Sequence, residues 1–307
     1  MNLLEIVWNF EPRVIPSFKL PAWYGLMWAA GFLVGYRIMD RMLKRENAPE
    51  GWMDKILIYS LLGGILGARF GHVFFYDWES YSDNPISMLK IWEGGLASHG
   101  GAIGIIIATF LLSKYVIKRP MVYILDRLVV PTAFAAFLIR LGNLFNHEIV
   151  GKATNSDFGF KFLRHDINQW EAIRLTGREY LHDAYSMIAN DPKFAYVLEQ
   201  VPNRYPAQLY EAICYLVIFG LLMWLYWKTN AAKLSGFLLG VFFTLLFSAR
   251  FFIEFIKESQ GGTDDAGLIE SFGINMGQIL SLPLVLFGLI LIFRKIGKLK
   301  RSTGEEA

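Results

Sequence analysis

Long apolar blocks dominate the chain, and polar stretches containing glycine and proline separate them. A bilayer core about 30 Å thick needs roughly 20 apolar residues per helix, because no backbone amide can stay unpaired in hydrocarbon. We predict seven transmembrane helices, near residues 22–37, 55–75, 96–112, 128–145, 207–227, 235–256 and 277–293. The predicted fold class is therefore an all-α integral membrane protein with about seven transmembrane helices.

One connection between the predicted helices is much longer than the others. Residues 152–204 lie between the fourth and fifth helices and are rich in polar and aromatic residues, such as Trp170 and Tyr180. We predict a small ordered head on the extracytoplasmic side, with a disordered loop as the alternative. Residues 1–307 then form a single membrane domain that carries this insertion.

Lysines and arginines gather at every second connection, around residues 37–55, 114–127, 228–233 and 294–301. Cytoplasmic loops of membrane proteins hold such an excess. This pattern predicts a multi-pass protein whose N-terminus is outside and whose C-terminus is in the cytoplasm.

The composition narrows the classes of function. Hydrophobic residues make up 54% of the chain and charged residues 19%, against about 25% charged in soluble domains. The formal net charge is +3, and the basic residues lie beside apolar blocks, so we expect no nucleic acid partner. The chain has one cysteine, Cys214, which excludes an intramolecular disulfide and a zinc cluster built from thiolates.

Ionisable side chains inside membrane spans are costly and mark candidate functional sites. With the predicted orientation, such groups lie in the outer half of the membrane on four helices: Arg69, His72, His99, Arg140, Arg250 and Glu254. Snorkelling of long side chains to the interface is the alternative explanation for Arg69 or Glu254 alone.

The end of the fourth predicted helix, residues 140–148, carries the densest polar pattern. Arg140 and Asn143 are three residues apart and share a helix face, and Asn146 and His147 continue that face. Gly142 allows a backbone or a lipid headgroup to approach closely. This segment predicts a polar pocket that receives an anion.

Two other segments point to the same ligand. His99 begins the third predicted helix and is followed by Gly100 and Gly101; backbone amides at such a helix start favour phosphate, although a lone histidine is often structural. Arg250 and Glu254 are four residues apart and are expected to pair, and arginine suits bidentate phosphate contact. The residues alone predict a membrane-embedded site for an anionic phospholipid headgroup.

Other kinds of site lack their defining parts. The five histidines show no pair at metal-ligand spacing, and Gly-x-Ser-x-Gly and Walker motifs are absent from the sequence. The sequence therefore does not support a zinc protease, a serine hydrolase or an ATPase.

Taken in order, several short segments resemble the prolipoprotein diacylglyceryl transferases across nearly the whole chain. These segments are residues 23–27, 64–69, 94–101, 140–151, 205–211, Arg250 with Glu254-Phe255, and 276–281. The chain departs from the family pattern at Ile139 and His147, where glycine is common, and at Tyr205, where histidine is frequent.

The resemblance implies transfer of the diacylglyceryl group from phosphatidylglycerol to the sulfur of the lipobox cysteine in a prolipoprotein signal peptide. A thioether forms and glycerol phosphate leaves, in the first step of bacterial lipoprotein maturation. It also implies location in the bacterial cytoplasmic (inner) membrane among membrane lipids, with no metal and no other cofactor.

The same resemblance suggests roles for individual residues. Arg140 and Arg250 hold the phosphate and stabilise the leaving group, while His99 is either the base for the thiol or a hydrogen-bonding anchor for the headgroup. The catalytic set is thus His99, Arg140 and Arg250. The expected phosphatidylglycerol-binding set comprises Tyr24, Arg69, Gly100, Gly101, Arg140, Asn143, Asn146, Glu148, Gly151, Glu254 and Gln278.

The alternative function is that of a phospholipid-handling transporter or binding protein. A conduit predicts polar residues through the full depth of the membrane, whereas the inner halves of the predicted helices hold few such groups. That distribution favours a one-sided lipid site.

Overall fold

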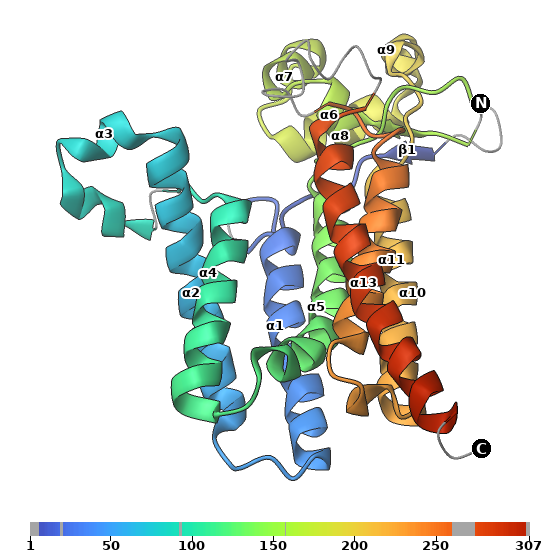
Figure 1. Cartoon of the computed structure of the whole chain (residues 1–307). Helices are drawn as coiled ribbons and strands as arrows, with labels where there is room; N and C mark the ends of the chain where they lie inside the picture. Colours follow the sequence, from blue (N-terminus) through green and yellow to red (C-terminus); the bar gives the residue numbers. More distant parts are fainter. Residues whose placement is uncertain (1–5, 19–20, 92–93, 157, 260–273, 305–307) are drawn as a thin grey trace.

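Long helices make up most of the computed structural model, which describes residues 6–18, 21–91, 94–156, 158–259 and 274–304 (Figure 1). A helix covers most of each predicted apolar segment. The long helices are α1 (Trp23–Arg45), α2 (Trp52–Tyr76), α4 (Ser98–Leu111), α5 (Met121–Phe145), α10 (Ala207–Lys228), α11 (Phe237–Ile253) and α13 (Met276–Gly304).

Within the described residues, five helical stretches are long and apolar enough to cross a membrane. They are α2, α4 with its π-helical continuation η3 (Leu112–Ile117), α5, α10, and α13 as far as Arg294. Helix α11 is apolar but has 17 residues, and the C-terminal part of α1 carries Arg37, Asp40 and Arg41. The chain is a membrane protein, and crossing by α1 and α11 stays a prediction.

Several helices run further than the apolar blocks that predicted them. Helix α1 continues past residue 37 to Arg45, and α5 begins at Met121 rather than at residue 128. Arg, Lys, Leu and Met are good helix formers, so a helix continues through them beyond the apolar block. The apolar block therefore predicts the membrane-spanning part of a helix and not its ends.

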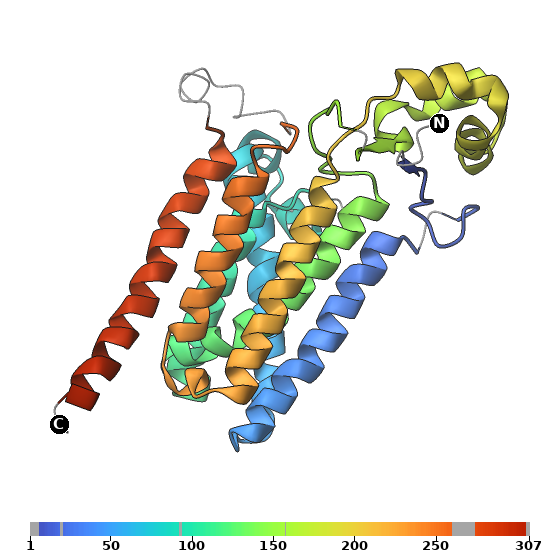
Figure 2. The same cartoon turned by 90° about the vertical axis from the view of Figure 1, so that its right-hand side faces the viewer.

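Five of the long helices stand side by side, in the order α13, α11, α10, α5 and α1 (Figure 2). Buried residues such as Val130, Tyr215, Leu222 and Leu238 form a core between α5, α10 and α11. This row of helices brings together the end of α5, the start of α10 and the end of α11.

Helices α2 and α4 form a separate pair, which packs mainly against itself. Gly67 of α2 lies against Gly100 of α4 so closely that a Cβ atom on Gly67 would overlap the Gly100 carbonyl oxygen. Small residues at such a crossing let two helix backbones touch. The loop between these helices, with α3 (Trp78–Ser82) and the 3₁₀ turn η1 (Pro85–Leu89), extends sideways (Figure 1).

The predicted insertion is an ordered unit at one end of the bundle (Figure 1). It contains a strand, β2 (Phe160–Phe162), followed by α6 (Leu163–Asp166), α7 (Gln169–Thr176), α8 (Leu181–Asn190), η4 (Pro192–Phe194) and α9 (Ala195–Gln200). Its own core includes Leu163, Ala184 and Ile188. A fully disordered loop, the alternative in the sequence analysis, is therefore wrong for the described part.

One element of this unit comes from the other end of the sequence. Strand β1 (Ile6–Trp8) pairs in parallel with β2, with Val7 opposite Lys161. The apolar pattern predicted only helices, because a three-residue strand gives no detectable alternation. At the opposite end of the bundle, the 3₁₀ turn η5 (Ala231–Lys233) joins α10 to α11.

Candidate active site

The end of α5 is joined to α10 by a buried ion pair. Arg140 Nε lies 2.8 Å from Glu211 Oε2, and the Glu211 side chain is 0% exposed. Arg140 Nη1 donates to Asn143 Oδ1 at 3.4 Å, so the predicted shared face of Arg140 and Asn143 is confirmed. Tyr215, one turn further along α10, interacts with the Arg140 side chain and donates to Glu211 at 3.5 Å.

A second polar group follows directly after α5. Asn143 Nδ2 donates to Glu148 Oε2 at 3.4 Å, and Asn146 Nδ2 donates to Glu148 Oε1 at 3.3 Å. Gln208 of α10 donates to the Glu148 carbonyl oxygen at 2.6 Å. Glu148 itself is exposed and Asn146 half-buried, so amide and carboxylate groups suited to hydroxyl ligands lie beside the arginine.

The backbone turns sharply at His147, where φ is +57°, and again at Ile149, where φ is +58°. Most non-glycine residues avoid this left-handed region, which explains why glycine suits the family position that His147 occupies here. The buried ring compensates through Nε2, which lies 2.9 Å from the Phe10 carbonyl oxygen. Burial lowers the pKa of His147 to about 4, so the ring is neutral at pH 7.

Gly151 ties three chain segments together. Its amide donates to the Tyr205 carbonyl oxygen at 2.9 Å, and the next amide, of Lys152, donates to the Ile256 carbonyl oxygen at 2.8 Å. A Cβ atom on Gly151 would overlap both the Tyr205 and Ile256 carbonyl oxygens. Gly151 is therefore required for the close approach of the segments after α5, before α10 and after α11.

The end of α11 supplies the second arginine. Arg250 is half-buried and lies close enough to Tyr215 to interact electrostatically with it, as Arg140 does. Among the described residues, Arg250 makes no hydrogen bond and no ion pair. The expected pairing of Arg250 with Glu254 is wrong, because Glu254 Oε2 lies 3.2 Å from Lys257 Nζ instead.

The reason for this different pairing is local. Glu254 is the C-cap residue directly after α11, and Lys257 follows three positions later. Glu254 also lies against Gly277, where a Cβ atom would approach its carboxyl carbon to 2.8 Å. The buried pair directs Glu254 toward α13 and leaves the Arg250 guanidinium available.

Two predicted residues border this region from other helices. Tyr24 of α1 covers Gly142, so close that a Cβ atom there would lie 2.7 Å from the tyrosine ring. Gln278 is buried and links Asn275 to the Phe251 carbonyl oxygen, which its Nε2 approaches to 3.3 Å. Ile139, the first departure from the family pattern, lines a cavity of about 120 Å³ between α1, α2 and α5.

The third predicted helix does not bring its histidine to the arginines. His99 is exposed, and its ring contacts Phe75 and Tyr76 of α2. Gly100 lies against the α2 backbone. A Cβ atom on Gly101 would lie 3.3 Å from the Gly64 carbonyl oxygen. Among the described residues, the hydrogen bonds and ion pairs do not connect His99 with the arginine group.

Arg69 is occupied by the loop between α2 and α4. It is 1% exposed, and its guanidinium donates to the carbonyl oxygens of Ser87 at 2.7 Å, of Met88 at 2.9 Å and of Gly94. It also lies 4.8 Å from the centre of the Tyr81 ring. Arg69 thus holds the loop against α2 through its hydrogen bonds. Phosphatidylglycerol binding by Arg69 stays a prediction.

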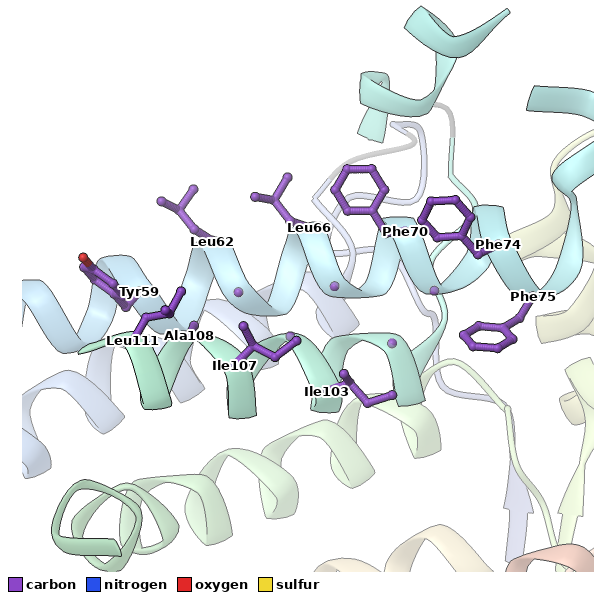
Figure 3. Close-up of a pocket in the computed structure, with 15 residues that line it drawn as sticks. Tyr59, Leu62, Leu66, Phe70, Phe74, Phe75, Ile103, Ile107, Ala108 and Leu111 are labelled. Atoms are coloured by element: carbon purple, nitrogen blue, oxygen red, sulfur yellow. The ribbon is translucent and has the colours of Figure 1, made fainter. Parts of the chain in front are cut away.

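An apolar groove of about 510 Å³ runs along the α2–α4 pair (Figure 3). Leu62, Leu66 and Phe70 line it from α2, and Ile103 and Ile107 line it from α4. Its floor is the glycine crossing of the two helices. The groove suits hydrocarbon and holds none of the polar groups described above.

Sequence reasoning missed Glu211 and Lys257 as members of the site. Glu211 lies inside the fifth apolar block and was an available signal, since a carboxylate in a membrane span is costly without a partner. Lys257 lies just past the predicted sixth helix and carried no signal. The structure therefore assembles two buried ion pairs, Arg140–Glu211 and Glu254–Lys257, beside the Arg250 guanidinium, which pairs with no carboxylate in the described part of the chain.

Such an arrangement can hold one anion. Each buried pair is neutral as a unit, and Arg250 remains as a positive group with five donors for oxygen ligands. A phosphodiester carries one negative charge and can pair with the Arg250 guanidinium. The neighbouring amides of Asn143 and Asn146 add donors for hydroxyl groups of the same ligand.

Comparisons with known proteins agree with this chemistry. The model of the family described as prolipoprotein diacylglyceryl transferase matches residues 14–294. Relatives that bear the name phosphatidylglycerol–prolipoprotein diacylglyceryl transferase are similar over nearly the whole length. One from Porphyromonas gingivalis is 44% identical over 298 residues, or 95% of each chain.

Two further relatives with the same name extend the similarity. One from Tolumonas auensis is 38% identical over 288 residues, which cover 94% of this chain and 96% of the relative. Another from Chloroherpeton thalassium is 36% identical over 292 residues, which cover 95% and 94%. The similarity therefore includes every helix that contributes to the arginine site.

Proposed function

The chain belongs to the prolipoprotein diacylglyceryl transferase family, and from this premise we propose that it transfers the diacylglyceryl group of phosphatidylglycerol to a prolipoprotein. The acceptor is the sulfur of the lipobox cysteine in the signal peptide. The reaction is the first step of lipoprotein maturation. The observation that supports it most strongly is that Arg250, which has no carboxylate partner among the described residues, lies beside the Arg140–Glu211 pair.

The chemistry requires one bond to form and one to break. The cysteine thiolate attacks a glycerol carbon of phosphatidylglycerol, a carbon–sulfur bond forms, and the carbon–oxygen bond to phosphate breaks. The electron pair of that bond leaves with glycerol phosphate, and the thiol proton passes to a base. Negative charge grows on the departing phosphate, where preorganised donors from Arg140 and Arg250 stabilise it most.

The headgroup glycerol fits the amide and carboxylate groups that follow α5. Asn143, Asn146 and Glu148 offer donors and acceptors for its hydroxyls, and Tyr24 closes the region from α1. His99 as base or anchor stays part of the proposal. His99 lies on α4, so it would act on the same substrates as Arg140 and Arg250 without a direct hydrogen bond to either arginine.

The topology completes the proposal. Seven helices cross a bacterial inner membrane, the N-terminus and the head of residues 152–204 lie outside, and the C-terminus lies in the cytoplasm. The alternation of Lys and Arg between connections supports this orientation. It places the arginine site near the outer leaflet, on the side where secreted prolipoproteins arrive.

A transfer assay with purified protein tests the proposal. Labelled phosphatidylglycerol and a lipobox peptide are incubated with wild type, Arg250→Ala and Arg178→Ala, an exposed arginine of the head. We expect thioether formation by wild type and Arg178→Ala and a loss of at least about 100-fold in kcat for Arg250→Ala. Because Arg250 makes no hydrogen bond among the described residues, its loss should leave the fold intact.

A peptide in which serine replaces the lipobox cysteine should accept nothing. Failure of lipid-reconstituted wild type to form thioether would overturn the proposal. Phosphatidylglycerol binding and lipid movement across vesicles, measured on the same protein, would then identify a binding protein or a transporter.

A further inference from the structure

Glu211 is a fully buried carboxylate that the proposed chemistry does not yet use. It lies on the first turns of α10, and its side chain is 0% exposed. Among the described residues, Glu211 has two partners, Arg140 Nε at 2.8 Å and the Tyr215 hydroxyl at 3.5 Å. A buried carboxylate normally needs several short hydrogen bonds, so Glu211 depends on the charge of Arg140.

The contact also sets the direction of Arg140. Glu211 meets the guanidinium at Nε, the nitrogen nearest the chain, while Asn143 receives Nη1 at 3.4 Å. A planar guanidinium held at two of its nitrogens has a fixed plane. Both arginines interact with Tyr215, so the Arg140 and Arg250 guanidinium groups lie near the same side chain.

The contact between Glu211 and Arg140 also changes the charge of the site. The Arg140–Glu211 pair is neutral as a unit, so Arg250 is the arginine of the site that has no carboxylate partner among the described residues, while the exposed Glu148 carboxylate lies on the solvent side of Asn143 and Asn146. The substrate is a phosphodiester with one negative charge, whereas the product is a phosphomonoester that gains a second charge with a pKa near 6. Two uncompensated arginines would hold this product more tightly than the substrate.

We infer that Glu211 is a positioning residue for the transfer reaction: it fixes the plane of Arg140 and cancels its charge, so that glycerol phosphate is released after transfer. The inference rests on the proposed function. Glu211 needs no contact with substrate for this role, and its complete burial agrees with that.

Two substitutions separate position from charge. Glu211→Asp keeps the charge and withdraws the carboxylate by one methylene, whereas Glu211→Gln keeps the length and removes the charge. We expect kcat to fall roughly 10- to 100-fold in Glu211→Asp, since a misplaced group costs that much, with an unchanged inhibition constant for glycerol phosphate. In Glu211→Gln we expect that inhibition constant to fall about tenfold, as for one added charged contact.

The controls keep the test decisive. Glu199→Gln removes a carboxylate charge at an exposed position of the head, so its inhibition constant for glycerol phosphate should match wild type. If Glu211→Gln does not fold, the inference requires Glu211→Asp to show the kcat loss.

A wild-type kcat in Glu211→Asp, or a wild-type inhibition constant in folded Glu211→Gln, overturns the inference. A merely structural glutamate would change the amount of folded enzyme and leave the inhibition constant of the folded fraction unaltered. An inactive wild type would instead contradict the proposed function itself.

Discussion

At the scale of the residue, His147 shows how a departure from the family pattern is accommodated. The position requires a left-handed backbone, with φ at +57°, where glycine is unstrained and other residues cost roughly 1–2 kcal/mol. The ring offsets this cost by burial and by its hydrogen bond with the Phe10 carbonyl oxygen. Thus His147 also ties the segment after β1 to the end of α5.

This burial predicts a dependence of stability on pH. The pKa of His147 is about 4 in the folded chain and about 6.5 in an unfolded one. The unfolded state therefore binds more protons below pH 6.5, and the free energy of unfolding falls between pH 6.5 and 4. The full loss is roughly 3 kcal/mol, and stability is unaffected by this group above pH 6.5.

Thermal unfolding in detergent between pH 7 and 4.5 measures the effect. His147→Asn, which tolerates the left-handed conformation and does not titrate, should have a flatter profile of Tm against pH than wild type. The exposed His182 of the head provides the control, His182→Asn. Parallel profiles for wild type and His147→Asn would contradict the explanation.

At the scale of the element, the α2–α4 pair is a rigid support for the loop between its helices. Glycines let the two backbones touch, and Arg69 extends from α2 to the carbonyl oxygens of Ser87, Met88 and Gly94. Arginine offers five donors in a fixed plane, whereas lysine is a point charge. The role of Arg69 therefore depends on shape as well as on charge.

We expect Arg69→Lys and Arg69→Ala to expose the loop of residues 77–97 to proteolysis equally, in detergent without phospholipid. A lysine cannot reach these separated carbonyl oxygens with the same geometry. If Arg69 acts instead as a phosphate ligand, neither variant should change the cleavage pattern of the lipid-free protein, and Arg69→Lys should retain part of the affinity for phosphatidylglycerol. The rate of loop cleavage, followed by mass spectrometry, distinguishes the two.

At the scale of the whole molecule, the helices form a row and a separate pair. The row of α13, α11, α10, α5 and α1 carries the arginine site (Figure 2), while the α2–α4 pair carries His99 and the apolar groove. The head lies at the end of the bundle where α5 ends and α10 begins (Figure 1). One face of the membrane should therefore contain both the head and the site.

Cysteine labelling tests this orientation, because the chain has a single cysteine. In a Cys214→Ala background we would introduce Glu179→Cys in the head and Ser235→Cys in the connection between α10 and α11, both exposed positions. A membrane-impermeant maleimide added to intact spheroplasts should label the head variant and spare the other until the membrane is lysed. The reverse pattern would overturn the proposed topology.

Much of the architecture was predictable because hydrocarbon imposes strict rules on sequence. Each apolar segment contains a long helix, and the described part of the segment between the fourth and fifth is ordered. The shared face of Arg140 and Asn143 followed from helical spacing and is confirmed. The pairing of Arg250 with Glu254 followed from the same spacing and is wrong, because a buried lysine beyond the helix competes for the carboxylate.

The apolar segments, the family and the two arginines could be identified from the sequence, since each depends on local composition or on motifs in order. Which charges meet depends on how the helices pack. Glu211 and Arg140 are 71 positions apart, and their contact depends on α5 packing against α10. The parallel pairing of β1 with β2 likewise joins residues more than 150 positions apart. Ion pairs and short strands between distant segments leave no periodic signal, because their energy comes from burial that only the assembled helices provide.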